Sequence, residues 1–96
     1  MVFELLLANS VSALVDDLES KDPQQHRKVI RCLAKLEQNP EHPGLQSHPY
    51  RTFDGPNGEA VFESYVENRT PAAWRVWWFY GPERRQITVV DLGPHP

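Results

Sequence analysis

The sequence has one cysteine, Cys32, and lacks both a long apolar run and an excess of positive charge. A lone cysteine excludes an internal disulfide and is compatible with a reducing compartment. The apolar start, Val2 to Ala8, is short, contains Glu4 and has no basic flank, so it fits neither a signal peptide nor a membrane span. We therefore expect a cytoplasmic protein that has no membrane partner.

The missing positive charge limits the nucleic-acid hypotheses. The formal net charge is -3, whereas proteins that bind nucleic acids usually carry a basic excess, because neutralising phosphates supplies much of their affinity. Any binding of RNA or DNA must therefore depend on a local basic patch. The 96 residues are enough for one hydrophobic core, and we expect a single domain over 1–96.

Spacing typical of a metal site is also missing. His42 and His48 lie six residues apart in a proline-rich segment, without a supporting cluster of cysteines or carboxylates. The sequence contains no phosphate-binding glycine loop, dinucleotide fingerprint or Ser–His–Asp pattern. We expect neither a metal nor another cofactor.

The pattern that is present predicts a strand followed by two helices. Residues 2–8 read as a strand, Asn9 or Ser10 offers a cap for a first helix, and Asp22-Pro23 begins a second helix that ends at Asn39-Pro40. The apolar stripes are Val11, Leu14, Val15 and Leu18, then Val29, Ile30, Leu33 and Leu36. The short link makes the helices antiparallel neighbours.

The second half of the chain predicts strands. A loop-rich segment with a short strand at 50–53 leads to three strand candidates at 60–67, 74–80 and 86–92, joined by links of hairpin length. The fold class is therefore α+β, with an N-terminal strand and an antiparallel helix hairpin packed on a C-terminal antiparallel sheet.

Arg75 stands out within the strand WRVWWFY. Alternation places Trp74, Val76, Trp78 and Tyr80 toward the helices, and Arg75, Trp77 and Phe79 on the other face. Two interpretations of Arg75 remain open. In the structural one it pairs with Asp91, if 81–85 is a five-residue loop, or with Glu67. In the functional one its guanidinium binds phosphate.

His95 is the second candidate. The last strand, if antiparallel to Trp74–Tyr80, brings His95 close to Arg75. A cation that holds a phosphate beside a group that exchanges protons near neutrality is a minimal phosphodiester-cleaving pair. The alternative is an ordinary solvated terminal histidine.

The chain as a whole resembles the RelE/ParE superfamily of bacterial toxins. The resemblance lies in the element order and in three strings: NPEHPGLQSHPYRTFDG, AWRVWWFY and ITVVDLGPHP. It implies a toxin of a type II toxin–antitoxin system that is held inactive by an antitoxin protein. RelE-like members are ribosome-dependent mRNA endoribonucleases, and ParE-like members instead poison DNA gyrase.

The resemblance also implies roles for particular residues. Arg75 matches the arginine of the penultimate strand, which stabilises charge on the cleaved phosphate, and His95 matches the C-terminal region with acid–base or orienting roles. The RNA 2′-hydroxyl would attack the adjacent phosphate without a metal. Glu63 is a candidate general base, but the segment AVFESYVE lacks the basic residues of active members. A non-catalytic binding protein, either a gyrase inhibitor or an inactive relative, therefore remains the alternative.

Basic side chains provide candidate contacts to nucleic acid. Lys28, Arg31 and Lys35 form a stripe on the second helix, and Arg51 and Arg69 could enlarge a basic patch near the sheet. The alternative for the stripe is an ordinary solvated face, with pairing to Asp16 and Asp17 of the first helix.

Overall fold

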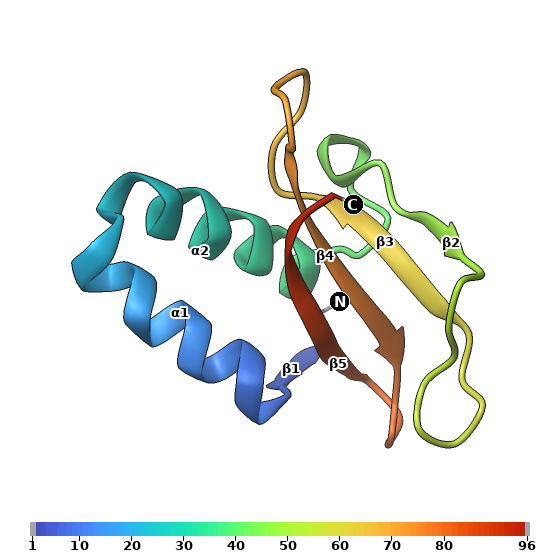
Figure 1. Ribbon diagram of the computed structural model, residues 1–96. Coiled ribbons are helices and arrows are strands. Elements are labelled where there is room, and N and C mark those ends of the chain that lie inside the picture. Colours follow the sequence, from blue (N-terminus) through green and yellow to red (C-terminus); the bar gives the residue numbers. More distant parts are fainter. Residues whose placement is uncertain (1, 96) are drawn as a thin grey trace.

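The computed structural model describes residues 2–95. Strand β1 (Glu4–Leu7) leads into helix α1 (Asn9–Lys21) and helix α2 (Pro23–Gln38), which run antiparallel on one side of the molecule (Figure 1). The predicted start of α2 is confirmed, because Gln25 N–H donates to Asp22 Oδ1 at 3.2 Å and Pro23 takes the first position. The predicted cap of α1 was wrong: Ala8 occupies that position and no side chain caps the helix.

Within the described residues the sheet has five strands in the order β1-β5-β4-β3-β2. A 3₁₀ turn, η1 (Pro43–Leu45), precedes β2 (His48–Tyr50), β3 (Val61–Tyr65), β4 (Trp74–Tyr80) and β5 (Gln86–Pro94). Strand β1 pairs parallel to β5, and the other neighbours are antiparallel. The α+β fold class is confirmed, although the short strand expected at 50–53 lies at His48–Tyr50 instead.

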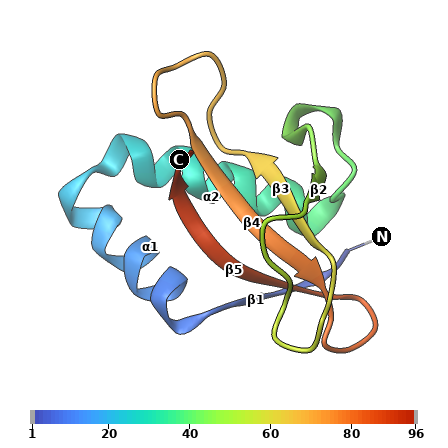
Figure 2. The ribbon, with the colours of Figure 1, turned by 45° about the vertical axis from the view of Figure 1, so that its right-hand side comes forward.

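Both helices cover the same face of this sheet (Figures 1 and 2). The core between the two layers contains Val29, Leu36, Val76, Trp78, Ile87 and Val89, each at most 1 % exposed. Ile30 was predicted to be buried but is 43 % exposed, whereas Cys32, in the same helix, is buried as its place in the apolar run predicts. None of the helices over residues 2–95 combines the length and the apolar composition that crossing a bilayer requires.

A chain of hydroxyl hydrogen bonds joins the segment before β2 to β3 and β4. Trp78 Nε1–H donates to Ser64 Oγ at 2.8 Å, and Ser47 Oγ donates to the carbonyl of Pro40 at 2.8 Å. The 2.7 Å contact between Ser64 Oγ and Ser47 Oγ is then donated by Ser64, since the single hydroxyl hydrogen of Ser47 is already donated to Pro40. The segment before β2 is thereby fixed to the centre of the sheet.

The register of the last hairpin decides which residue faces Arg75. Tyr80 pairs with Ile87, and a β-bulge between Trp77 and Trp78 adds one residue to β5, so that Arg75 lies opposite Gly93. The expected pairing of Tyr80 with Gln86 and of Arg75 with Asp91 was therefore wrong. The turn shifts the register by one residue and the bulge by one more.

Candidate functional site

The face of the sheet that the helices leave uncovered carries the candidate site. The residues gathered there come from four strands: His48 and Tyr50 from β2, Glu63 and Tyr65 from β3, Arg75 and Trp77 from β4, and Asp91 and Gly93 from β5, with His95 just beyond its end. The alternation of side chains along each strand produces this grouping, since the residues between them face the core.

Glu63 lies at the centre of the group and is only 3 % exposed. Trp77 Nε1–H donates to its Oε2 at 3.0 Å, and His48 Nε2 lies 2.9 Å from its Oε1. His95 Nε2 lies 3.6 Å from Oε2, which is a charge contact rather than a hydrogen bond. Because the carboxylate is buried, a hydroxyl of a large substrate cannot reach it directly. Glu63 can act on such a substrate only through its neighbours.

Arg75 has no carboxylate partner among residues 2–95, neither Asp91 nor Glu67. Its Nη1 donates to the backbone carbonyls of Glu67 at 2.7 Å and of Trp74 at 3.1 Å, and the guanidinium carbon stands 3.6 Å above the centre of the Tyr65 ring. Its Nε is buried without a hydrogen-bond partner in this part of the chain. The two carbonyls and the Tyr65 ring thus hold the guanidinium in place, and no carboxylate within residues 2–95 pairs with its charge.

The carboxylate of Glu67 turns away from Arg75 toward α2. It accepts hydrogen bonds from Lys28 at 2.9 Å and from Trp74 N–H at 3.1 Å. Burial works to raise the pKa of Glu67, but these hydrogen bonds and the charge of Lys28 outweigh it, and the pKa is lowered.

A recess of about 320 Å³ lies beside Trp77. It is lined by Tyr50, Phe53, Trp77, Asp91, Leu92, Gly93 and Pro94. A Cβ placed on Gly93 would meet no described atom within 4 Å beyond its chain neighbours, so the missing side chain leaves this space open directly opposite Arg75. Three aromatic rings and one carboxylate around such a space can accommodate a planar polar ring.

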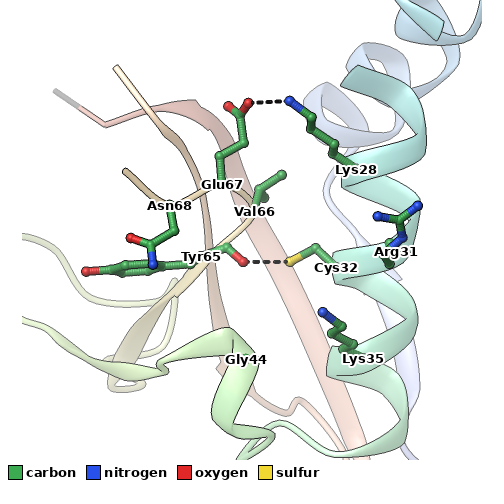
Figure 3. A pocket seen from close by; sticks show the side chains of 9 residues that line it. All are labelled: Lys28, Arg31, Cys32, Lys35, Gly44, Tyr65, Val66, Glu67 and Asn68. Carbon is green, nitrogen blue, oxygen red and sulfur yellow. Dashed lines mark hydrogen bonds and ion pairs between the residues drawn. The ribbon is translucent and has the colours of Figure 1, made fainter. Parts of the chain in front are cut away.

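The basic residues of α2 line a different pocket, on the helix side of the sheet. Lys28, Arg31 and Lys35 border a space of about 140 Å³ between α2 and the end of β3, and the ring of Tyr65 points away from it (Figure 3). Lys28 pairs with Glu67 at 2.9 Å, so the expected pairing of the stripe with α1 was wrong for this residue. Asp17 instead pairs with Lys21 at 3.0 Å.

The remaining candidates lie apart from one another. Arg51 follows β2 beside the start of β3, whereas Arg69 follows the end of β3, and both are exposed. Burial raises the pKa of Cys32 to about 12, against an opposing effect of Lys35, so its thiol is unreactive at neutral pH. Among residues 2–95 no group of three or more His, Cys, Asp and Glu side chains is placed to hold a metal ion.

Three participants were not predicted from the sequence: His48, Tyr65 and the indole N–H of Trp77. His48 was considered only as a metal ligand, and its pairing with Glu63 depends on the register of β2 on β3. Trp77 was assigned to the correct face, but its hydrogen bond to Glu63 depends on the pairing of those two residues across β3 and β4. No local sequence pattern predicts the register of β2 on β3 or of β3 on β4.

The comparisons with known proteins agree with this geometry at the level of the fold. No protein-family model and no curated protein sequence matches the chain. A chain of the archaeal RelE-RelB complex from Pyrococcus horikoshii OT3 is similar, with a TM-score of 0.67 and 14% identity over 98% of this chain and 96% of that one. A YoeB/ParE toxin from Agrobacterium tumefaciens has a TM-score of 0.73 and 10% identity over 97% and 99%. The chain therefore adopts the fold of the RelE/ParE toxin superfamily, as the sequence predicted.

Proposed function

We propose that this protein is the toxin of a toxin–antitoxin system and that it cleaves messenger RNA on the ribosome. The observation that carries the proposal is the guanidinium of Arg75, which has no carboxylate partner within residues 2–95 and lies on the uncovered face of the sheet with the Glu63–His95 pair. The similar structures, a RelE-RelB complex and a YoeB/ParE toxin, support a toxin role. Cytoplasmic location follows from the proposed target.

The roles of the residues follow from their exposure. Nη2 of Arg75 faces the scissile phosphate and stabilises the charge that develops when the 2′-hydroxyl attacks it. His95, whose side chain is 46% exposed, transfers protons to and from the reacting oxygens. Glu63 is the buried carboxylate behind His95 and holds its imidazole in place, as the third member of a catalytic triad does. It therefore serves as an orienting group rather than as the direct base.

Other surfaces are proposed to hold the RNA and the partner protein. The recess at Gly93 takes a nucleobase next to the scissile phosphate, between the rings of Tyr50 and Trp77. Basic side chains are proposed to contact phosphates of messenger or ribosomal RNA: Lys28, Arg31, Lys35, Arg51 and Arg69. The antitoxin adds an extended segment to an exposed sheet edge, and β2 is one such edge strand, or packs a helix on α1 and α2.

The direct test compares Arg75→Ala with Arg84→Ala. Arg84 is an exposed arginine at the tip of the β4–β5 hairpin, so its loss removes the same charge far from the site. Expression of the wild type and of Arg84→Ala should stop growth and cleave ribosome-bound messenger RNA. Arg75→Ala should lower the cleavage rate by about 10²–10³-fold, the effect of removing one group that stabilises the transition state. Intact growth and intact messenger RNA with the wild type would refute the proposal.

One observation favours a second candidate, a binding protein without nuclease activity such as an inhibitor of DNA gyrase. Nη1 of Arg75 already joins the carbonyls of Glu67 and Trp74, which gives the arginine a structural role without any substrate. A gyrase supercoiling assay separates the two candidates. Inhibition of supercoiling that persists in His95→Ala, without RNA cleavage by the wild type, would favour the inhibitor.

A further inference from the structure

The imidazole of His48 is held at both of its nitrogens. Nδ1 lies 2.8 Å from the backbone carbonyl oxygen of Gln46, and Nε2 lies 2.9 Å from Oε1 of Glu63. A carbonyl oxygen only accepts hydrogen bonds, so Nδ1 must carry a proton. This fixes one of the two ring protons of His48 from geometry alone.

The contact at Nε2 must then contain a second proton. Either Nε2 carries it and Glu63 is ionised, or Nε2 is bare and the carboxyl group carries it. The His48–Glu63 pair has no net charge in both cases. Loss of this proton would leave two lone pairs facing each other at 2.9 Å beside a carboxylate that is only 3 % exposed. The proton is therefore trapped between the two side chains.

A proton on the second oxygen of Glu63 would have no acceptor at hydrogen-bond distance within residues 2–95, because His95 Nε2 lies too far away. Oε2 accepts from Trp77 Nε1, which is only a donor, at 3.0 Å, and it also faces His95 Nε2 at 3.6 Å. The other charged or titratable groups around the pair are the Tyr65 ring, edge-on to His48, the Arg75 guanidinium above Tyr65, and Asp91 opposite Trp77. His95 therefore faces a carboxylate whose charge is already balanced at its other oxygen.

We propose that His48 is a positioning residue that shares one proton with Glu63 and thereby keeps the site from locking His95 in its charged form. A bare buried carboxylate 3.6 Å away would hold a proton on His95, and a group that holds its proton too firmly transfers it poorly. The placement of the proton between His48 and Glu63 follows from the hydrogen-bond geometry and does not depend on the proposed function. Its consequence for RNA cleavage rests on the proposed function.

The test uses nitrogen-15 spectra of the histidine rings in the full chain across neutral pH. In the wild type, the His48 ring should keep both of its contacts across neutral pH, and the same spectra follow the protonation of His95. In His48→Gln, the amide still donates to Glu63 but supplies no transferable proton, so Glu63 becomes a full anion. His95 should then keep its proton to a pH higher by about one to two units.

Glu63→Gln supplies the opposite arm of the test. If the pair is already neutral, this variant should leave the titration of His95 nearly where it is in the wild type. A large downward movement in Glu63→Gln, together with no movement in His48→Gln, would overturn the proposal. So would a His48 ring that loses a proton near neutrality in the wild type. These spectra need no RNA cleavage, so failure of the nuclease hypothesis and failure of the shared proton are distinguished.

Discussion

The buried polar groups on the two faces of the sheet differ in charge and in hydrogen-bond partners. On the helix side, the buried polar groups are uncharged and satisfied: Ser64 connects Trp78 to Ser47, and the Cys32 thiol, whose pKa is raised to about 12 by burial, lies 3.6 Å from a backbone carbonyl. On the other face, a buried carboxylate contacts two histidines, and Arg75 keeps an unpartnered Nε within the described chain. The first arrangement stabilises a fold, whereas the second retains charges that a stable core alone does not require.

The largest expected effect on the helix side comes from Leu36→Ala. Leu36 is 0 % exposed at the centre of the core, so its truncation leaves a cavity and should lower the free energy of unfolding by about 2–5 kcal/mol. Chemical denaturation measures this loss. A loss below about 1 kcal/mol would mean that the core collapses around the gap, so that the helix side of the sheet is less tightly packed than a stable core requires.

Ser64→Ala addresses the hydroxyl chain. The change leaves the indole N–H of Trp78, a residue that is 1 % exposed, without an acceptor, and should cost about 1–3 kcal/mol of unfolding free energy. Ser12→Ala is a suitable control, because Ser12 lies on α1 at a half-buried position away from this chain. Equal losses in the two variants would show that the hydroxyl chain adds little.

The two faces also differ in how far the sequence could predict them. Apolar periodicity located Val29, Leu33 and Leu36, and alternation placed Trp78 in the core. Buried apolar residues recur in the sequence with the period of their helix or strand, so they can be recognised from it. The residue opposite Arg75 on β5 could not be predicted, since it depends on a bulge between Trp77 and Trp78 that shifts every pair toward the start of β4. His48 reaches Glu63 only through pairing of a three-residue strand. Register is a property of two strands together, which neither strand encodes alone.

On the uncovered face, Gly93→Val should affect function rather than stability. The added side chain enters open space in the recess opposite Arg75, and the glycine lies within β5, where valine is favourable. If the recess holds a nucleobase, RNA cleavage should fall by about 10-fold or more, the usual effect of losing a base contact, while the denaturation midpoint stays the same. Gly93→Ala gives a graded control, and full activity of the valine variant would remove the recess from the proposed site.

The smallest effect concerns Glu67, which lies where the two faces meet and whose pKa is lowered by Lys28 and Trp74 N–H despite its burial. A depressed carboxyl pKa stabilises the folded state above the unfolded value of about 4.3, and this contribution disappears as pH falls through the lower folded value. Glu67→Gln should therefore be less stable than the wild type at pH 7, and the difference should shrink on acidification. Chemical denaturation at pH 7 and at an acidic pH measures the difference in stability. Glu19→Gln, a change at an exposed position on α1, is the control. A difference that stays constant with pH would mean that Glu67 acts through packing rather than through its charge.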